Sequence, residues 1–116
     1  MYINGFVAAV PADNKQAYKE TAERFWDIVK DWGAITQMEC WEVDVEDGHT
    51  TDFRRAVKAE DGEKIVFAWV IWPDRETAKA AEQKMMEDPR MEGWDMPFDG
   101  KRMIFGGFET LVHKGK

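Results

Sequence analysis

Hydrophobic residues along the chain follow two different periods, which predict strands and helices in turn. Residues 2–10 are rich in β-forming side chains and stop at Pro11, which predicts a first strand. Apolar residues then recur every three or four positions, which predicts an amphipathic helix over residues 13–32. Asp13 is expected to cap the start of this helix, and Gly33 stands where a left-handed terminating residue belongs.

The middle of the chain reads as two strands joined by a polar loop. Residues 34–45 alternate between two sets of side chains, which is the period of a strand. Residues 46–64 are mostly polar, with a short extended piece expected around Phe53. Residues 65–72 are continuously apolar, which predicts a strand covered on both faces.

One more helix and one more strand are expected in the last third. Residues 75–88 follow Asp74, a good capping residue, and carry a helical apolar stripe made of Ala78, Ala81 and Met85. Residues 90–100 form a long connection, and residues 101–113 are expected to form the final strand. Residues 1–116 therefore read as one α+β domain of order β-α-β-β-α-β.

This order predicts a ferredoxin-like subunit, in which a four-stranded antiparallel sheet carries both helices on one face. The strands at 65–72 and 101–113 nevertheless have apolar side chains on both of their faces. A bare apolar sheet face is an association surface. A second copy is the economical cover, so a C2 homodimer with two facing sheets is expected.

Composition and charge narrow the partners and the compartment. The formal charge is -7 and basic residues are scattered, so the electrostatic footprint of a nucleic-acid binder is missing. Cys40 is the only cysteine, which favours a reducing compartment. The first residues do not resemble a signal peptide, and the apolar run at 65–72 is too short to span a membrane. We therefore expect a cytoplasmic protein without nucleic-acid or membrane partners.

Several longer motifs give the chain a family resemblance. They are GFVAAVP at 5–11, Met38-Glu39 and Cys40, VFAWVIWP at 66–73, DPRM at 88–91 and MPFDGKRMIFGGFE at 96–109. With these motifs the chain resembles the DUF1428 family, small bacterial proteins with a dimeric α+β barrel fold. The middle loop departs from the family, which tends to have Thr-Ser-Phe-Pro where this chain has Thr51-Asp52-Phe53-Arg54. The resemblance implies the fold and the dimer, and it implies no reaction.

A small-molecule cleft between the sheet and the helices is the first functional hypothesis. Arg102 could clamp a carboxylate or phosphate with two hydrogen bonds, and tryptophan rings could line a pocket for an aromatic ligand. The alternatives are that Arg102 pairs with an acidic side chain and that the rings form core or dimer interface. The candidate ligand-binding residues are Phe98, Asp99, Arg102, Glu109, Trp69 and Trp94.

The sequence offers few side chains that could act as catalytic groups. Glu39, Glu42 and Glu109 lie inside predicted strands, where a buried carboxylate could act as a general base and an exposed or ion-paired one would not. The two histidines and the single cysteine have no partners at metal-ligand spacing, so neither a metal nor another cofactor is expected. Whether the protein is an enzyme stays open. The alternatives are a non-catalytic dimeric interaction protein, and an enzyme like the cofactor-independent monooxygenases and isomerases of similar barrels.

Overall fold

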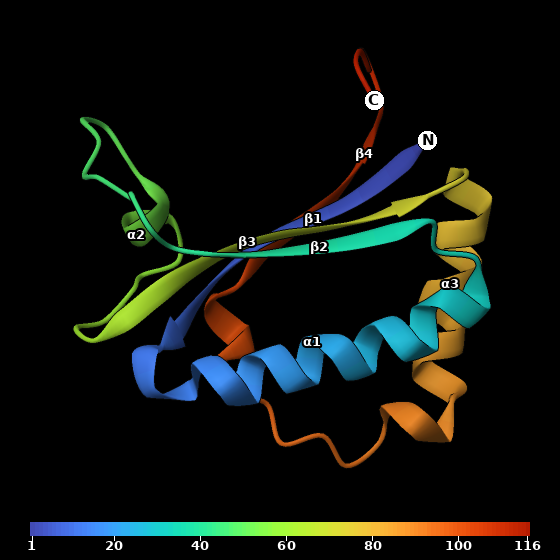
Figure 1. Cartoon of the computed structure of the whole chain (residues 1–116), viewed down its shortest axis with the longest axis horizontal. Helices are drawn as coiled ribbons and strands as arrows, with labels where there is room; N and C mark the ends of the chain where they lie inside the picture. The colour runs from blue at the N-terminus through green and yellow to red at the C-terminus, as the bar shows by residue number, and fades with distance from the viewer.

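The computed structural model describes residues 1–116 as an α+β structure built on one open antiparallel sheet (Figure 1). Its strands are β1 (Tyr2–Pro11), β2 (Thr36–Trp41), β3 (Glu63–Trp72) and β4 (Ile104–Glu109). They lie in the order β2-β3-β1-β4, and each neighbouring pair is antiparallel. The α+β class and the four-stranded antiparallel sheet predicted from the sequence are thus confirmed.

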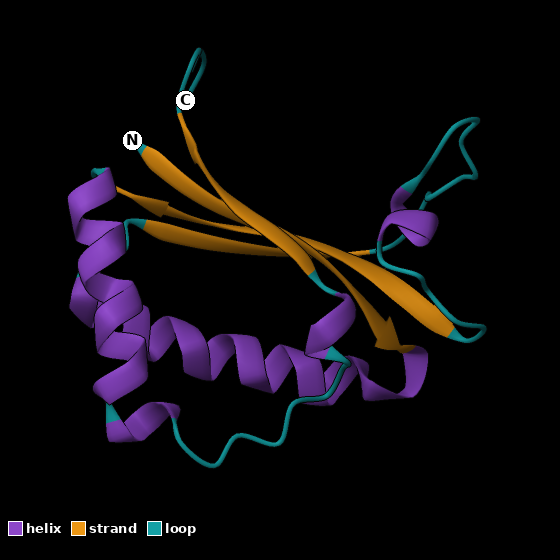
Figure 2. Ribbon diagram, turned by 180° about the vertical axis from the view of Figure 1, so that it is seen from behind, coloured by secondary structure: helices purple, strands orange, loops and turns teal.

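Two long helices cover one face of this sheet (Figure 2). They are α1 (Lys15–Val29) and α3 (Arg75–Glu87). Both pack on the same side of β3: Val29, Ala78 and Ala81 contact Val70 and Trp72 in one buried cluster. A second cluster joins α1 to the sheet through Tyr18, Val10, Val66 and Ala68. The prediction of two helices on one face is confirmed.

The ends of the helices show which local signals were decisive. Gly33 has φ of 103°, as a terminating glycine should, and a Cβ there would lie 2.9 Å from the Thr77 methyl group. Asp74 caps α3 by accepting a hydrogen bond from the Thr77 backbone N–H at 2.7 Å. The cap predicted at Asp13 is wrong, because the chain enters α1 through a 3-10 turn at Ala12–Asn14 that contains Asp13.

The loop before β3 contains a third helix, α2 (Phe53–Ala56), where an extended piece was expected. Asp52 nucleates this single turn by accepting a hydrogen bond from the Arg55 backbone N–H at 2.7 Å. That bond is the main reason why the pKa of Asp52 falls to about 2. The turn carries Val57 onto the open face of the sheet, where it packs on Val7, Ala9 and Ile65. One corner of the open face is therefore covered by the chain itself.

Strand β4 is shorter than predicted. Residues Gly100–Arg102 form a 3-10 turn capped by Asp99, whose side chain accepts from the Lys101 backbone N–H. Arg102 therefore precedes the strand instead of lying in it. The pairing of β4 with β1 is continuous from Val7–Ile104 to Tyr2–Glu109, so the two glycines of the C-terminal motif do not form a bulge.

Gly107 instead allows a close approach. A Cβ at this position would overlap the hydroxyl end of the Tyr2 ring, whereas a Cβ at Gly100 would meet nothing within 4 Å. We therefore expect Gly107→Ala to lower the free energy of unfolding by about 1–2 kcal/mol, because the ring must move from its place. Urea unfolding monitored by tryptophan fluorescence measures this loss. Gly100→Ala is the matched control and should stay within about 0.5 kcal/mol of the wild type. Equal effects at both glycines would contradict the close-approach explanation.

Candidate functional site

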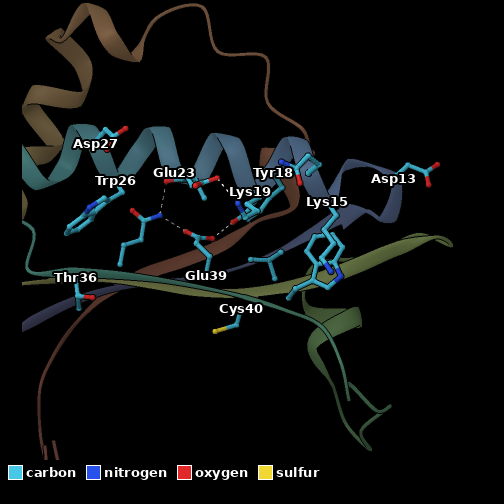
Figure 3. Close-up of a pocket in the computed structure, with 15 residues that line it drawn as sticks. Asp13, Lys15, Tyr18, Lys19, Glu23, Trp26, Asp27, Thr36, Glu39 and Cys40 are labelled. Atoms are coloured by element: carbon cyan, nitrogen blue, oxygen red, sulfur yellow. Dashed lines mark hydrogen bonds and ion pairs between the residues drawn. The ribbon is translucent and has the colours of Figure 1, made fainter.

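The main cavity of the molecule lies between α1 and the edge strand β2, and its volume is about 1040 Å³ (Figure 3). Helical spacing places Tyr18, Ala22 and Trp26 on one side of it. Strand alternation places Gln37, Glu39 and Trp41 on the other side. Cys40 points to the opposite face of the strand (Figure 3). The cavity therefore forms where the 3.6-residue period of α1 meets the two-residue period of β2.

Three polar side chains form the floor of this cavity. Tyr18 donates its hydroxyl hydrogen to Glu39 Oε1 at 2.5 Å. Gln37 Nε2 donates to Glu39 Oε2 at 3.1 Å and to the backbone carbonyl oxygen of Ala22 at 3.1 Å. These bonds tie α1 to β2 and hold the Glu39 carboxylate in one orientation. We call Tyr18, Gln37 and Glu39 the polar floor.

The protonation of the polar floor follows from its burial. Burial raises the pKa of the Glu39 carboxyl, and the hydrogen bonds from Tyr18 and Gln37 offset part of that rise. Burial also raises the pKa of the Tyr18 hydroxyl, and the nearby Glu39 charge raises it further. Tyr18 therefore stays protonated at neutral pH and serves as a hydrogen-bond donor to Glu39.

Gln37 leaves one hydrogen-bonding atom unused. Its Oε1 is the one buried side-chain polar atom in the chain without a hydrogen-bond partner. The amide orientation is fixed, because Nε2 faces two acceptors and a flipped amide would turn its oxygen toward both of them. Native proteins rarely leave such an atom unsatisfied, so each case calls for a physical reason.

The mouth of the cavity carries aromatic and charged side chains. The Lys15 ammonium lies 5.4 Å from the centre of the Trp41 ring, which is a cation–π geometry. Lys19 pairs with Glu23 at 3.1 Å on the exposed surface of α1. Among the residues that line the cavity, four are acidic and two are basic. They are Asp13, Glu23, Asp27 and Glu39, and Lys15 and Lys19.

Three of the six residues proposed from the sequence lie near the C-terminal turn. Phe98 packs on the Tyr18 ring, with the ring centres 5.7 Å apart, and so supports the polar floor from behind. Arg102 donates two hydrogen bonds to Glu63, at 2.8 and 2.7 Å, and a third to Asp99 at 3.1 Å. The guanidinium group also bonds the Lys58 carbonyl oxygen, so its donors are engaged within the protein.

The other three residues lie apart from one another. Trp69 sits on the open face of the sheet, where its ring contacts Phe67. Trp94 packs under the Arg24 guanidinium at 4.3 Å and against the edge of Phe25. Glu109 ends β4 as an exposed residue opposite Tyr2. The structure does not gather the six residues into one site.

The sequence carries part of the signal for the residues that do line the cavity. Strand alternation already put Gln37, Glu39 and Trp41 on the same side of β2. The sequence left two alternatives for Glu39 and Glu42: a buried carboxylate, or an exposed or ion-paired position on an edge strand. Neither side chain is exposed, and Glu42 is ion-paired. Glu39 is half-buried in the polar floor, and the Glu42 carboxylate is buried against Arg54. The useful signal was a carboxylate grouped with Gln37 and Trp41 on one side of an edge strand, and the packing of α1 determines that this side faces the helix.

The chain contains neither a cluster of metal-binding side chains nor a membrane-spanning helix. No group of three or more His, Cys, Asp or Glu side chains has the geometry to hold a metal ion. None of the helices combines the length and the apolar character that crossing a membrane requires.

Fold and site together define a small α+β protein with an open antiparallel sheet and one cavity floored by polar side chains. A sequence model of the family described as "Protein of unknown function (DUF1428)" matches residues 1–100, so the chain belongs to this family. The family resemblance recognised from the motifs is confirmed. The family match ends at the start of the Gly100 turn, so most of the C-terminal motif lies beyond it.

Individual relatives extend the similarity further along the chain. The chain is 56% identical over 113 residues to "Uncharacterized protein YbaA" of Escherichia coli strain K12. That alignment covers 96% of this chain and 97% of the relative. A protein of the same name from Shigella flexneri matches with the same identity and the same coverage. Neither name gives an activity.

Proposed function

We propose that this protein binds a small organic molecule in the cavity between α1 and β2. The observation that carries the proposal is the polar floor, whose Gln37 Oε1 is buried without a partner at the lining of a large cavity. Small-molecule sites typically enclose some hundreds of cubic ångströms, combine apolar walls with a few placed polar groups, and are few per protein. The Trp26 and Trp41 rings supply such walls here, which favours a planar or aromatic ligand.

The residues first proposed for binding take different parts in this proposal. Phe98 contributes indirectly, because it holds Tyr18 against Glu39. Arg102 and Asp99 contribute through the turn that positions Phe98, next to them in the chain. Trp69 lies on the open face of the sheet, and Glu109 lies at the end of β4. Trp94 lies on the outer side of α1, near Arg24 and Phe25. A ligand that reached these three residues would need a surface other than the cavity.

A blocked cavity tests the proposal. Ala22 is half-buried in the cavity wall, and Ala17 lies on the exposed surface of the same helix. We expect fragments that shift the NMR signals of Gln37 and Trp41 in the wild type to stop binding to Ala22→Phe, because the new ring fills the space. Ala17→Phe is the matched control and should bind them as the wild type does. The proposal fails if no fragment perturbs cavity residues, or if binding survives in the blocked variant.

We also propose that the protein acts in the cytoplasm as a homodimer of ferredoxin-like subunits, whose open sheet faces meet to form an α+β barrel. The antiparallel order β2-β3-β1-β4 and the two helices on one face support this arrangement. The opposite face exposes large apolar side chains that no segment of the chain covers. They include Met38, Phe67, Ile104 and Phe108, which are 45–61% exposed.

The total surface supports the same proposal. The chain exposes 8039 Å², whereas a folded monomer of 13.5 kDa typically exposes about 6500 Å². The excess of roughly 1500 Å² includes the exposed residues 111–116, and it exceeds the roughly 800 Å² per partner that a standard interface buries. A second copy is a fitting occupant, since two identical apolar faces are complementary under a two-fold axis.

A further inference from the structure

We infer that the cavity between α1 and β2 selects organic cations that carry a planar ring, such as protonated arylalkylamines, over anions of the same shape. The inference rests on the proposed function, because it names the ligand class for that cavity. It departs from the anionic ligand that Arg102 first indicated, since the Arg102 donors are engaged by Glu63, Asp99 and Lys58. Three features of the cavity support it: its unused hydrogen-bonding atoms, its charge and its aromatic walls.

The polar floor offers acceptors to a ligand. The Tyr18 hydroxyl hydrogen is already given to Glu39, and both located hydrogen bonds of Gln37 Nε2 go to protein oxygens. What remains are the free lone pairs of the Glu39 carboxylate, and behind them the buried Gln37 Oε1, which has no partner. A ligand reaching the floor must therefore bring donors, as an ammonium or an amide N–H does. A carboxylate ligand would place acceptors against acceptors.

The charge of the lining points the same way. Four acidic residues and two basic residues line the cavity. Lys19 is paired with Glu23, and both side chains are more than half exposed at the mouth. Glu39 is the acidic group at the floor, and its half-buried position strengthens the field of its carboxylate charge. An anion placed at the floor would meet repulsion from Glu39, and a cation placed there would gain a charge-assisted hydrogen bond.

The aromatic wall already holds a cation. The Lys15 ammonium lies over the face of Trp41, where the ring attracts positive charge. Lys15 is exposed and projects from the start of α1, so this side chain can swing away without disturbing the core. A ligand's cationic group can take the place of the Lys15 ammonium over the Trp41 ring.

Three probes with the same ring test this ligand class: tryptamine, 3-methylindole and indole-3-acetate. They carry a positive charge, no charge and a negative charge at pH 7. NMR titration of the full chain should give the order tryptamine, then 3-methylindole, then indole-3-acetate. We expect tryptamine to bind roughly tenfold or more tightly than indole-3-acetate. This ranking is measured on the wild type, so it does not depend on how any variant folds.

Glu39→Gln separates charge from shape. The substitution keeps the side-chain volume and is expected to weaken tryptamine binding roughly tenfold, with 3-methylindole changed less than about twofold. Glu76→Gln removes an exposed carboxylate on α3, outside the cavity, and is the matched control, with an expected change below about twofold for all three probes. A tryptamine affinity that Glu39→Gln leaves unchanged would overturn the role given to Glu39.

The outcomes for ligand class and for the site are distinguishable. If indole-3-acetate binds most tightly and Ala22→Phe abolishes that binding, the cavity is a binding site and the cation preference is wrong. The cation preference is also overturned if none of the probes binds at millimolar concentration while other fragments shift Gln37 and Trp41. If the probes bind equally well to Ala22→Phe, the cavity itself is the wrong site. If the three probes bind in the expected order and Ala22→Phe abolishes their binding, both proposals are supported.

Discussion

Arg102→Ala is expected to lower the melting temperature by about 5–10 °C, more than any other single ion-pair change in the chain. The Glu63 side chain is 8% exposed, and Arg102 meets its two carboxylate oxygens with two parallel hydrogen bonds of 2.8 and 2.7 Å. Removing the guanidinium leaves a buried carboxylate with the Glu60 backbone N–H as its remaining charge-stabilising donor. A buried charge that loses its partner is strongly destabilising, whereas an intact pair contributes far less.

The pH dependence of this loss has a definite sign. Hydrogen bonds from Arg102 are the main reason why the pKa of Glu63 lies below its ordinary value of 4.5. A carboxyl whose pKa falls on folding stabilises the folded state at pH values above its unfolded pKa. That stabilisation is lost as the pH falls through the lower, folded pKa. We therefore expect the difference in melting temperature between wild type and Arg102→Ala to shrink as the pH falls below about 4.5.

Differential scanning calorimetry at a fixed protein concentration measures both effects. Lys79→Ala is the matched control, because Lys79 pairs with Glu82 at 3.3 Å on the surface of α3, where both side chains are about half exposed. Exposed pairs contribute little, so this variant should melt within about 2 °C of the wild type. Similar melting temperatures for the Arg102 and Lys79 variants would show that the Glu63 carboxylate can be hydrated without its partner.

The order of strands and long helices could be predicted because each element carries its own period. Residues 65–72 are apolar without interruption, and the helix after Asp74 combines a cap with an alanine stripe. These signals are local, and the structure places β3 and α3 within two residues of the predicted bounds. Helix α2 was missed because a single turn is too short to show a period. Its one sequence signal is Asp52, which stands three residues before Arg55 and accepts a hydrogen bond from the Arg55 backbone N–H.

The site could be predicted only in part, because it depends on contacts between distant residues. Alternation along β2 groups Gln37 with Glu39, but it does not tell which face lies under a helix. That choice is made by Tyr18, 21 positions before Glu39, which closes the cavity floor from α1. The partner of Arg102 is likewise 39 positions away, on β3. The sequence shows that Arg102 can bind a carboxylate, but it does not show that the Glu63 carboxylate already occupies the guanidinium group.

Phe67→Lys is expected to convert a dimer into a monomer, with association weakened roughly 100-fold or more. Phe67 lies in β3 on the open face of the sheet, 48% exposed, and its ring contacts Phe53 and Trp69. In a dimer with facing sheets this position would be buried against the second copy. An ammonium there would lose its hydration without gaining a partner, and the second subunit would bring the same charge to the same interface.

Sedimentation velocity at micromolar concentration measures this effect. Met86→Lys is the matched control, since Met86 is 82% exposed on α3, which lies on the helical side of the sheet. Both variants add one positive charge in place of one exposed apolar side chain, so they differ mainly in the face that they alter. Met86→Lys should sediment as the wild type does, and Phe67→Lys should sediment as a folded monomer with an unchanged far-UV circular dichroism spectrum.

Two results would contradict the facing-sheet dimer in different ways. A wild-type monomer at micromolar concentration would mean that Phe67, Ile104 and Phe108 stay in contact with water, or that a different protein covers them. A wild-type dimer that Phe67→Lys leaves intact would mean that the subunits associate through another surface. The edge of β2 beside the cavity would then be the next surface to test, because its backbone groups on that side pair with no other strand.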